Sequence, residues 1–197
     1  MTDVSALRGV PDVSNDVRDR FQRDIMLQFE AAHRFARYLS RDADAAQDIV
    51  QEAFLQAYRG FQGYHGGDPR AWIFAIVRNC YRTWLMQRRR KMRLETESNS
   101  RPLPEEDPAL NVASDVDTPE MLILRRAEST TVQLVLDSMP GPLREMLVLR
   151  ELEGLSYRQI ADVVAVPIGT VMSRLARARQ HFGAVWRRQL EDWESGK

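Results

Sequence analysis

The sequence has almost no cysteine, since Cys80 is the only one among 197 residues. A single thiol cannot form an internal disulfide or a multi-cysteine zinc site, which excludes a secreted disulfide scaffold and a zinc finger. Long apolar runs are also missing, and no stretch approaches the roughly 20 residues that cross a bilayer. The first residues lack the basic start and apolar run of a signal peptide. We expect a reduced, cytoplasmic protein without membrane insertion.

Recognisable catalytic chemistry is lacking as well. The three histidines, His33, His65 and His181, are scattered, and His65 with Asp68 makes only a weak metal pair. The chain contains no phosphate-binding loop and no nucleophile motif. An enzyme is therefore the least favoured class, and the sequence predicts no catalytic residue, no metal site and no cofactor.

Net charge is zero, because 28 basic residues balance 28 acidic ones. The balance is not local: residues 70–93 carry eight basic side chains and no acidic one, and residues 163–190 carry five and none. Residues 94–120 hold eight acidic side chains and one basic one. Phosphate responds to the local field, so the two basic blocks predict two nucleic-acid-binding surfaces. Arginines on ordinary solvated helices would give the same pattern.

Apolar residues recur at spacings of three and four, and no useful strand pattern appears, which predicts an all-α fold. We expect one helix over residues 24–39 and a second from Asp42 or Asp44 to Gly60. A third begins at Pro69 or Arg70 and runs into the basic residues 88–91. The glycines between Gly60 and Pro69 predict a loop.

These helices predict two small domains, over residues 21–93 and 119–197. Residues 1–20 are polar and aperiodic, which predicts a flexible arm. Residues 94–118 are acidic and contain prolines, which predicts a flexible linker between the domains. The second domain should begin with helices over residues 119–137 and 143–153, separated by the Pro140–Gly141–Pro142 break.

Residues 156–182 predict a helix-turn-helix. Ser156 and Gln159 have the spacing of a capping box, and a short helix to Val164 should follow. Residues 165–167 form the turn. The next helix buries one apolar face and presents the opposite face to solvent, where short polar side chains and guanidinium groups can reach phosphates or base edges: Thr170, Ser173, Arg174 and Arg177. An ordinary helical hairpin remains the alternative.

The stretch over residues 139–182 closely resembles region four of the extracytoplasmic-function (ECF) sigma factors of bacterial RNA polymerase. Its most specific part is GTVMSRLARAR, residues 169–179. Residues 42–58 and 69–79 resemble region two of the same family, and the two matches follow the family order. The resemblance implies an alternative sigma factor that binds core polymerase and directs promoter-specific initiation, in a stress or signal response.

The resemblance also implies three sets of contact residues. One face of the second helix would dock on the clamp helices of the polymerase β′ subunit, through Asp48, Gln51, Glu52 and Leu55. The loop and third helix would read the minus-ten element as single-stranded DNA, by stacking and cationic contacts from Phe61, Tyr64, His65, Arg78, Asn79, Arg82, Arg88, Arg89 and Arg90. The second domain would read the minus-thirty-five element as duplex through Tyr157, Arg158, Thr170, Ser173, Arg174 and Arg177. Its apolar candidates for the β flap are Leu147, Leu149 and Leu152.

Four residues depart from the family pattern. Gln47 and Thr83 stand where acidic residues are common in the family. At Gln47 the change weakens one contact with the polymerase. Ala165 occupies a turn position that is often glycine, where a left-handed backbone costs about 1 kcal/mol. Met172 replaces a basic residue of the recognition helix, so one phosphate or base contact is missing.

Two rival functions share parts of this pattern. A helix-turn-helix regulator acting without polymerase needs the second domain but not the Asp48 face or the aromatic loop. A sigma mimic that sequesters an anti-sigma factor would lose its DNA-facing arginines, and this chain keeps them. An anti-sigma partner is itself an expectation from the family.

Overall fold

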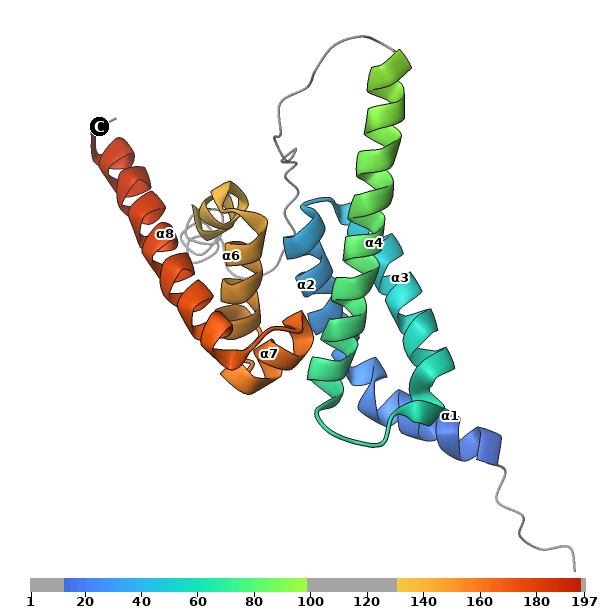
Figure 1. Cartoon of the computed structure of the whole chain (residues 1–197). Coiled ribbons are helices and arrows are strands. Elements are labelled where there is room, and N and C mark those ends of the chain that lie inside the picture. The colour runs from blue at the N-terminus through green and yellow to red at the C-terminus, as the bar shows by residue number, and fades with distance from the viewer. Residues whose placement is uncertain (1–12, 99–130, 196–197) are drawn as a thin grey trace, which may run out of the picture.

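The computed structural model describes residues 13–98 and 131–195, and every regular element within these ranges is a helix (Figure 1). This confirms the all-α prediction. The first range contains α1 (Val13–Asp24), the short 3₁₀ turn η1 (Met26–Gln28), α2 (Phe29–Ser40), α3 (Ala43–Gly60), the 3₁₀ turn η2 (Phe61–Gly63) and α4 (Pro69–Ser98).

Helical structure begins earlier in the chain than the sequence suggested. Residues 13–20 lie in α1, so the prediction of a flexible arm over residues 1–20 is wrong for them. The helix is held by Phe21, whose buried ring meets the rings of Tyr58 and Phe61 edge-on, at centroid distances of 5.2 and 5.3 Å. Val17, one turn earlier, also packs on the core, whereas the other described side chains of α1 are polar. This apolar stripe is short, which is why periodicity missed the helix. Residues 1–12 lie outside the described residues.

A sharp reversal connects α2 to α3. Arg41 ends α2 in the left-handed region, with φ 57°, and Asp42 begins α3 as its N-cap. The Asp42 carboxylate accepts hydrogen bonds from the backbone N–H groups of Asp44 and Ala45, at 3.1 and 3.0 Å. This satisfies donors that the helix leaves unpaired. Of the two caps considered from sequence, Asp42 is therefore the one used.

The helix α4 crosses this bundle and continues past it. Phe74 of α4 stacks on Phe35 of α2, with ring centroids 5.0 Å apart. The last turns extend beyond the other helices and run to Ser98, so the predicted linker is wrong for residues 94–98 (Figure 1). Residues 99–118 of that linker lie outside the described residues.

In the second range, residues 131–138 are helical. They agree with the end of the helix expected over 119–137, of which residues 119–130 are not described. The following elements are α6 (Gly141–Leu147), the π-helical turn η3 (Val148–Leu152), α7 (Tyr157–Val164) and α8 (Ile168–Ser195). The helix predicted over 143–153 is thus divided: α6 starts two residues earlier, with Pro142 in its first turn, and ends in a π turn.

The helix-turn-helix has the predicted local chemistry. Both hydrogen bonds of the Ser156–Gln159 capping box are present. Ala165 ends α7 in the left-handed conformation, with φ 52° and ψ 51°, so alanine performs the turn that glycine usually makes. The axis bends by 101° between α7 and the first part of α8, within the range of helix-turn-helix motifs. Apart from this bent pair, none of the described helices is long and apolar enough to cross a membrane.

The two halves lie against each other. α4 packs on α7, and α2 packs on α6 (Figure 1). Buried apolar residues from both halves belong to one contiguous cluster. The surfaces that face each other are therefore covered in this arrangement.

Candidate polymerase and promoter interface

The outer face of α3 is available to a partner. Ile49, Val50, Ala53 and Phe54 turn into the core, and because a helix has 3.6 residues per turn the opposite side faces solvent. That exposed side carries all of the predicted polymerase contacts: Asp48, Gln51, Glu52 and Leu55. Glu52 accepts a hydrogen bond of 2.8 Å from the Gln56 amide, which holds its carboxylate on this face. Gln47 is exposed beside Asp48.

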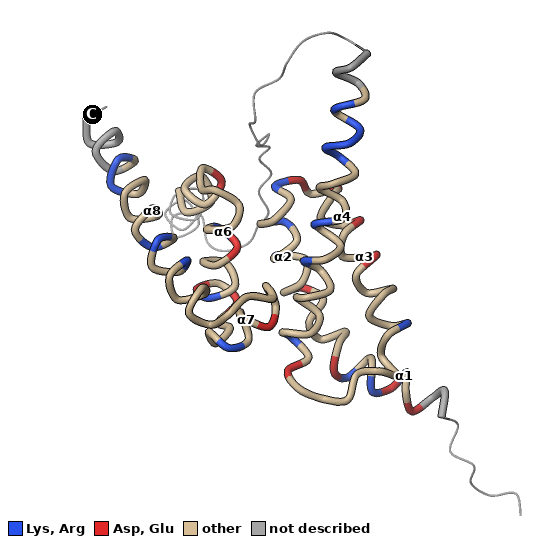
Figure 2. The backbone as a smooth tube through the Cα atoms, viewed as in Figure 1, with Lys and Arg blue, Asp and Glu red and all other residues tan. Residues whose placement is uncertain are grey.

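The basic end of α4 forms a second exposed surface (Figure 2). Asn79, Arg82, Arg89 and Arg90 are exposed, whereas the half-buried Arg88 lies over the Trp84 ring at 5.1 Å. No acidic side chain lies on α4 between Pro69 and Leu94, so this helix presents a nearly uniform positive field. Such a track suits a phosphate backbone.

In the aromatic loop before α4, residues 61–68, the aromatic rings pack against one another and against α4. Phe61 and Tyr64 are only 2% and 9% exposed, and their rings pack with Trp72. The Tyr64 hydroxyl donates to the Gly67 carbonyl at 3.0 Å, and burial raises the pKa of this phenol. In this conformation neither ring offers an open face to a base, whereas His65 is exposed. Base contacts by these three residues stay predictions.

Arg78, which the sequence predicted to contact DNA, forms an ion pair within the protein instead. Its Nε donates to Oε1 of Glu145 on α6 at 2.6 Å, and both side chains are nearly buried. The guanidinium therefore joins the two halves rather than facing solvent. Its release requires that α4 and α6 separate.

A further carboxylate of the second half is buried in the same interface. The Glu153 side chain is 0% exposed and lies between two arginines of the first half: Arg34 of α2, at 3.2 Å, and Arg70 of α4, at 2.5 Å. Buried charge is costly unless it is paired, so this contact depends on both partners.

Weaker contacts border these ion pairs. Arg41 donates to the Met139 carbonyl at 3.0 Å and lies 3.8 Å from the Asp137 carboxylate. Gln159 of α7 donates to Asp68, in the loop before α4. The predicted minus-ten loop and the start of the helix-turn-helix are thereby in direct contact.

Sequence reasoning missed the whole interface. Glu145 and Glu153 stand among other charged residues of the same segment, Arg144, Arg150 and Glu151, so the local sequence does not single them out. Their partners lie 67 to 119 residues away along the chain, beyond the reach of local pattern.

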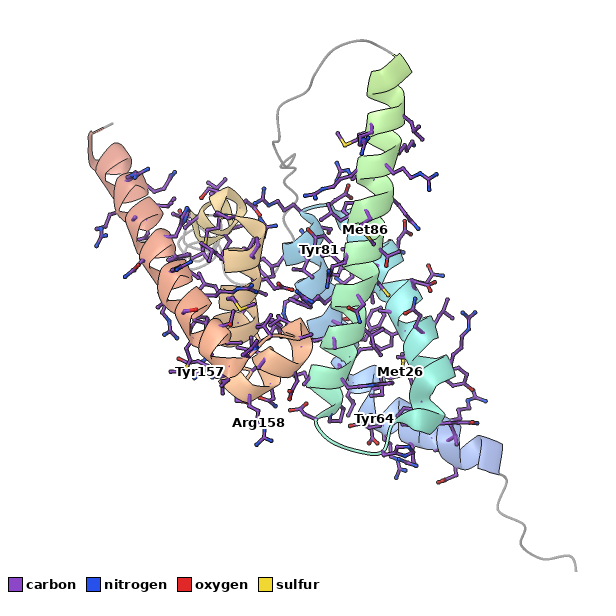
Figure 3. The ribbon with its side chains drawn as sticks, viewed as in Figure 1. Met26, Tyr64, Tyr81, Met86, Tyr157 and Arg158 are labelled. Atoms are coloured by element: carbon purple, nitrogen blue, oxygen red, sulfur yellow. The ribbon has the colours of Figure 1, made fainter. Side chains whose placement is uncertain are left out.

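The recognition helix α8 presents its predicted polar face only in part. Ser173 and Arg177 are exposed, whereas Thr170 and Arg174 are half-buried. The Ser173 hydroxyl donates to the Thr170 carbonyl at 3.0 Å. At the start of α7, Arg158 extends into solvent, and the half-buried Tyr157 ring lies under the Arg150 guanidinium at 5.1 Å (Figure 3).

An apolar hollow of about 380 Å³ lies between α8, α6 and η3, outside the recognition surface. Leu147 and Leu152, two of the three β-flap candidates, line it with Val132, Leu136 and Phe182. Leu149, the third, is fully buried in the core and cannot contact a partner in this conformation. The Arg179–Glu151 ion pair, at 2.7 Å, borders the hollow.

The geometry described above agrees with the comparisons to known proteins. Residues 30–91 match the family model described as Sigma-70 region 2, and residues 129–182 match Sigma-70, region 4. The first range spans α2, α3 and most of α4, and the second includes α6, η3, α7 and the first half of α8.

Several curated relatives match both halves. The RNA polymerase sigma-H factor of Pseudomonas aeruginosa is 39% identical over 141 residues, covering 71% of this chain and 72% of the relative. The ECF RNA polymerase sigma-E factors of Haemophilus influenzae and Escherichia coli K12 are each 34% identical, and cover 78% and 75% of this chain and 79% and 78% of the relatives.

Solved structures share the fold. The sigma factor RpoE of Bartonella quintana, in complex with the anti-sigma factor NepR, matches with a TM-score of 0.67 at 24% identity, over 86% of this chain and 98% of RpoE. CnrH, in complex with the cytosolic domain of CnrY, matches with a TM-score of 0.55 at 21% identity, over 89% and 90%.

A two-part helical chain with these matched regions in this order is a bacterial transcription initiation factor. The chain belongs to the ECF sigma factors. It is an alternative sigma factor that binds core RNA polymerase and promoter DNA.

Proposed function

We propose that this sigma factor holds core polymerase through the outer face of α3 and reads two promoter elements with its two halves. The observation that carries the proposal is the exposure of Asp48, Gln51, Glu52 and Leu55 together on one helix face. Carboxylates beside an amide and a leucine suit a helix-on-helix contact with the β′ clamp helices. A DNA-binding regulator that works alone has no use for this face.

The first half reads the minus-ten element through the cationic track of α4. Asn79, Arg82, Arg89 and Arg90 already face solvent and can follow a single-stranded backbone. Arg78 and the rings of Phe61 and Tyr64 join them once the loop and the interface rearrange. Base stacking, worth roughly 1 to 3 kcal/mol per base, offsets the cost of exposing the two rings.

The second half reads the minus-thirty-five element as duplex, with the start of α8 in the major groove. Base edges are contacted by Ser173 and Arg177, with Thr170 and Arg174 at the edge of this contact surface. The DNA backbone is approached by Tyr157 and Arg158. The hollow lined by Leu147 and Leu152 receives an apolar segment of the β flap.

Promoter recognition requires the halves to separate. The two elements are centred about 25 base pairs apart, which is roughly 85 Å of duplex at about 3.4 Å per base pair. Asp68 and Gln159, which lie at the minus-ten loop and the helix-turn-helix, are hydrogen-bonded to each other. The arrangement described here is therefore a closed form, and core polymerase binds the open one.

An anti-sigma factor that covers the exposed faces is the regulatory partner we propose. The RpoE structure was determined with the anti-sigma factor NepR, and the CnrH structure with the cytosolic domain of CnrY. The polymerase performs the chemistry of initiation, so the chain acts without enzymatic activity of its own. It acts where core polymerase is, in the bacterial cytoplasm.

Transcription in vitro tests the proposal. Purified protein is added to bacterial core polymerase on its own upstream promoter or a genomic library, and specific transcripts are expected. Arg174→Ala with Arg177→Ala should remove initiation on promoters that depend on the upstream element. Arg187→Ala with Arg188→Ala removes the same charge from an exposed part of α8 farther along and should leave initiation intact.

Two results would contradict it. Tight core binding without transcripts on any template indicates a sigma mimic. Duplex DNA binding without affinity for core polymerase indicates a regulator that acts alone.

A further inference from the structure

The outer surface of the recognition helix carries two strips of side chains. Side chains four residues apart lie on the same side of a helix, so Ser173 and Arg177 form a polar strip. Ile168, Met172 and Ala176 form the strip beside it, and all three are exposed. Ile168 is 49% exposed and Met172 is 54% exposed, although both are large apolar residues. Apolar spacing in the sequence placed Ile168 on the buried face of this helix, and its exposure shows that this prediction is wrong. The sequence marked Met172 only as a missing basic contact.

This apolar strip lies outside the fully buried face of α8. The helix α8 packs on the core through other residues, the buried Val171, Leu175 and Ala178. The interface between the halves uses α7 and α6 against α4 and α2, and leaves the strip open. If this helix enters a DNA groove, we therefore expect the exposed isoleucine and methionine to contact an apolar group of the DNA.

The major groove offers one apolar group on its base edges, the C5 methyl of thymine. Met172 has a flexible, unbranched side chain that can adapt to a methyl group. It has no donor for the acceptors that every base pair presents in this groove, so the thymine methyl is the one feature that it can favour, and a G·C pair offers none. A basic residue at this position would reverse that preference.

We propose that Ile168 and Met172 read thymine methyl groups in the minus-thirty-five element, so that this sigma factor selects a T at one or two positions of it. The inference rests on the proposed function, since it requires α8 in the major groove. The polar strip of Ser173 and Arg177 lies beside these positions and supplies the hydrogen-bonding part of the readout.

Replacing thymine with deoxyuridine tests this directly, because only the methyl group is removed. A holoenzyme of core polymerase and this chain first selects its upstream element from a randomised promoter library. Each selected thymine is then replaced singly, and the holoenzyme affinity is measured. We expect about fourfold weaker binding at one or two positions, the loss for one buried methyl. The same replacement should have no effect with Met172→Ala combined with Ile168→Ala.

A matched control is Gln180→Ala, an exposed residue one turn beyond Ala176 on the same helix, which should keep the full methyl dependence. Methyl dependence that persists when Met172 and Ile168 are both alanine would overturn the inference. So would a selected element without any methyl dependence, although the proposed function would then stand. A holoenzyme that selects no element and starts no transcript would refute the proposed function itself.

Discussion

At Ala165 the backbone takes a conformation that its side chain disfavours. The residue joins α7 to α8 with φ 52° and ψ 51°, in the left-handed region. For a residue with a Cβ this costs roughly 1 to 2 kcal/mol. The turn is retained because both helices are fixed by packing, with Ile160, Val164 and Val171 buried on either side of it.

Ala165→Gly should therefore stabilise the protein. Relief of the left-handed strain outweighs the 0.4 to 1 kcal/mol that glycine loses through greater freedom of the unfolded chain, giving a net gain of about 1 kcal/mol. Denaturant unfolding followed by circular dichroism measures it. Ala176→Gly, the same exchange in an ordinary helical position, should lower stability by about 1 kcal/mol. Equal losses at both positions would contradict the strain account.

The lone thiol should be unreactive in the folded protein. Burial, with a smaller contribution from the negative charge of Glu52, raises the pKa of Cys80 to about 11. At pH 8 the thiolate fraction is then about one in a thousand, against about a quarter for a free cysteine of pKa 8.5. Because the thiolate is the reactive form, alkylation by iodoacetamide should be about 200-fold slower than in denaturant. The native rate should rise with pH up to about 11, and equal rates at pH 8 would contradict the prediction.

The helix α3 shows how one element serves two purposes. Its inner side closes the core, and its outer side leaves Asp48 and Leu55 free for a partner. Substitutions on the outer side should therefore change binding without changing the fold, because they remove no buried contact.

Asp48→Lys and Leu55→Ala should each weaken core polymerase binding about tenfold, or about 1.4 kcal/mol. Thermal unfolding should change little. Affinity can be measured with labelled protein and purified core enzyme. Asp162→Lys makes the same charge change on an exposed position of α7 and should leave affinity unaltered. If it weakened binding equally, net charge rather than the α3 face would account for the effect.

Periodicity predicted the helices well where one face is apolar, and it failed at their ends. The α3 cap and the capping box of α7 were both visible in sequence, since each is a contact between residues two or three apart. The first turns of α1 and the last turns of α4 were missed, because their surfaces are mostly polar. The π turn at Val148 has no local sequence signal that we recognise.

The whole molecule is held closed by charges as well as by apolar packing. Three acidic residues of the second half face arginines of the first: Asp137, Glu145 and Glu153. Arg34 and Arg70 remain partly exposed, so they can return to water when the halves separate. Such contacts favour one arrangement without preventing release, and salt should weaken those that water reaches.

Glu145→Gln combined with Glu153→Gln should open the molecule. The variant keeps similar volumes but loses the ion pairs to Arg34, Arg70 and Arg78, so the halves separate more often. Energy transfer between dyes placed on Arg59 and Arg188, each changed to cysteine in a Cys80→Ser background, should fall in the variant. In the labelled protein that keeps Glu145 and Glu153, higher salt should also lower the energy transfer.

Glu151→Gln is the matched control, because the Glu151 partner, Arg179, lies within the same half. It should leave the energy transfer unchanged. An unchanged signal in the double variant as well would mean that apolar packing alone closes the molecule.

The sequence by itself determined the helices, the two-part order and the residue types on each exposed face. Those properties are local: a helix face repeats every three to four residues, and a cap or a turn spans fewer than five. The family resemblance, carried by residues 42–58, 69–79 and 139–182, supplied the function, and the comparisons confirm it.

Only the tertiary structure decided which of these residues are free to act. Phe61, Tyr64 and Arg78 look like DNA contacts in sequence, yet folding buries two of them and pairs the third with Glu145. Met172 looked like a missing contact, yet it lies exposed in an apolar strip with Ile168. The reason is that availability depends on neighbours distant in sequence, and these are brought together only when the helices pack.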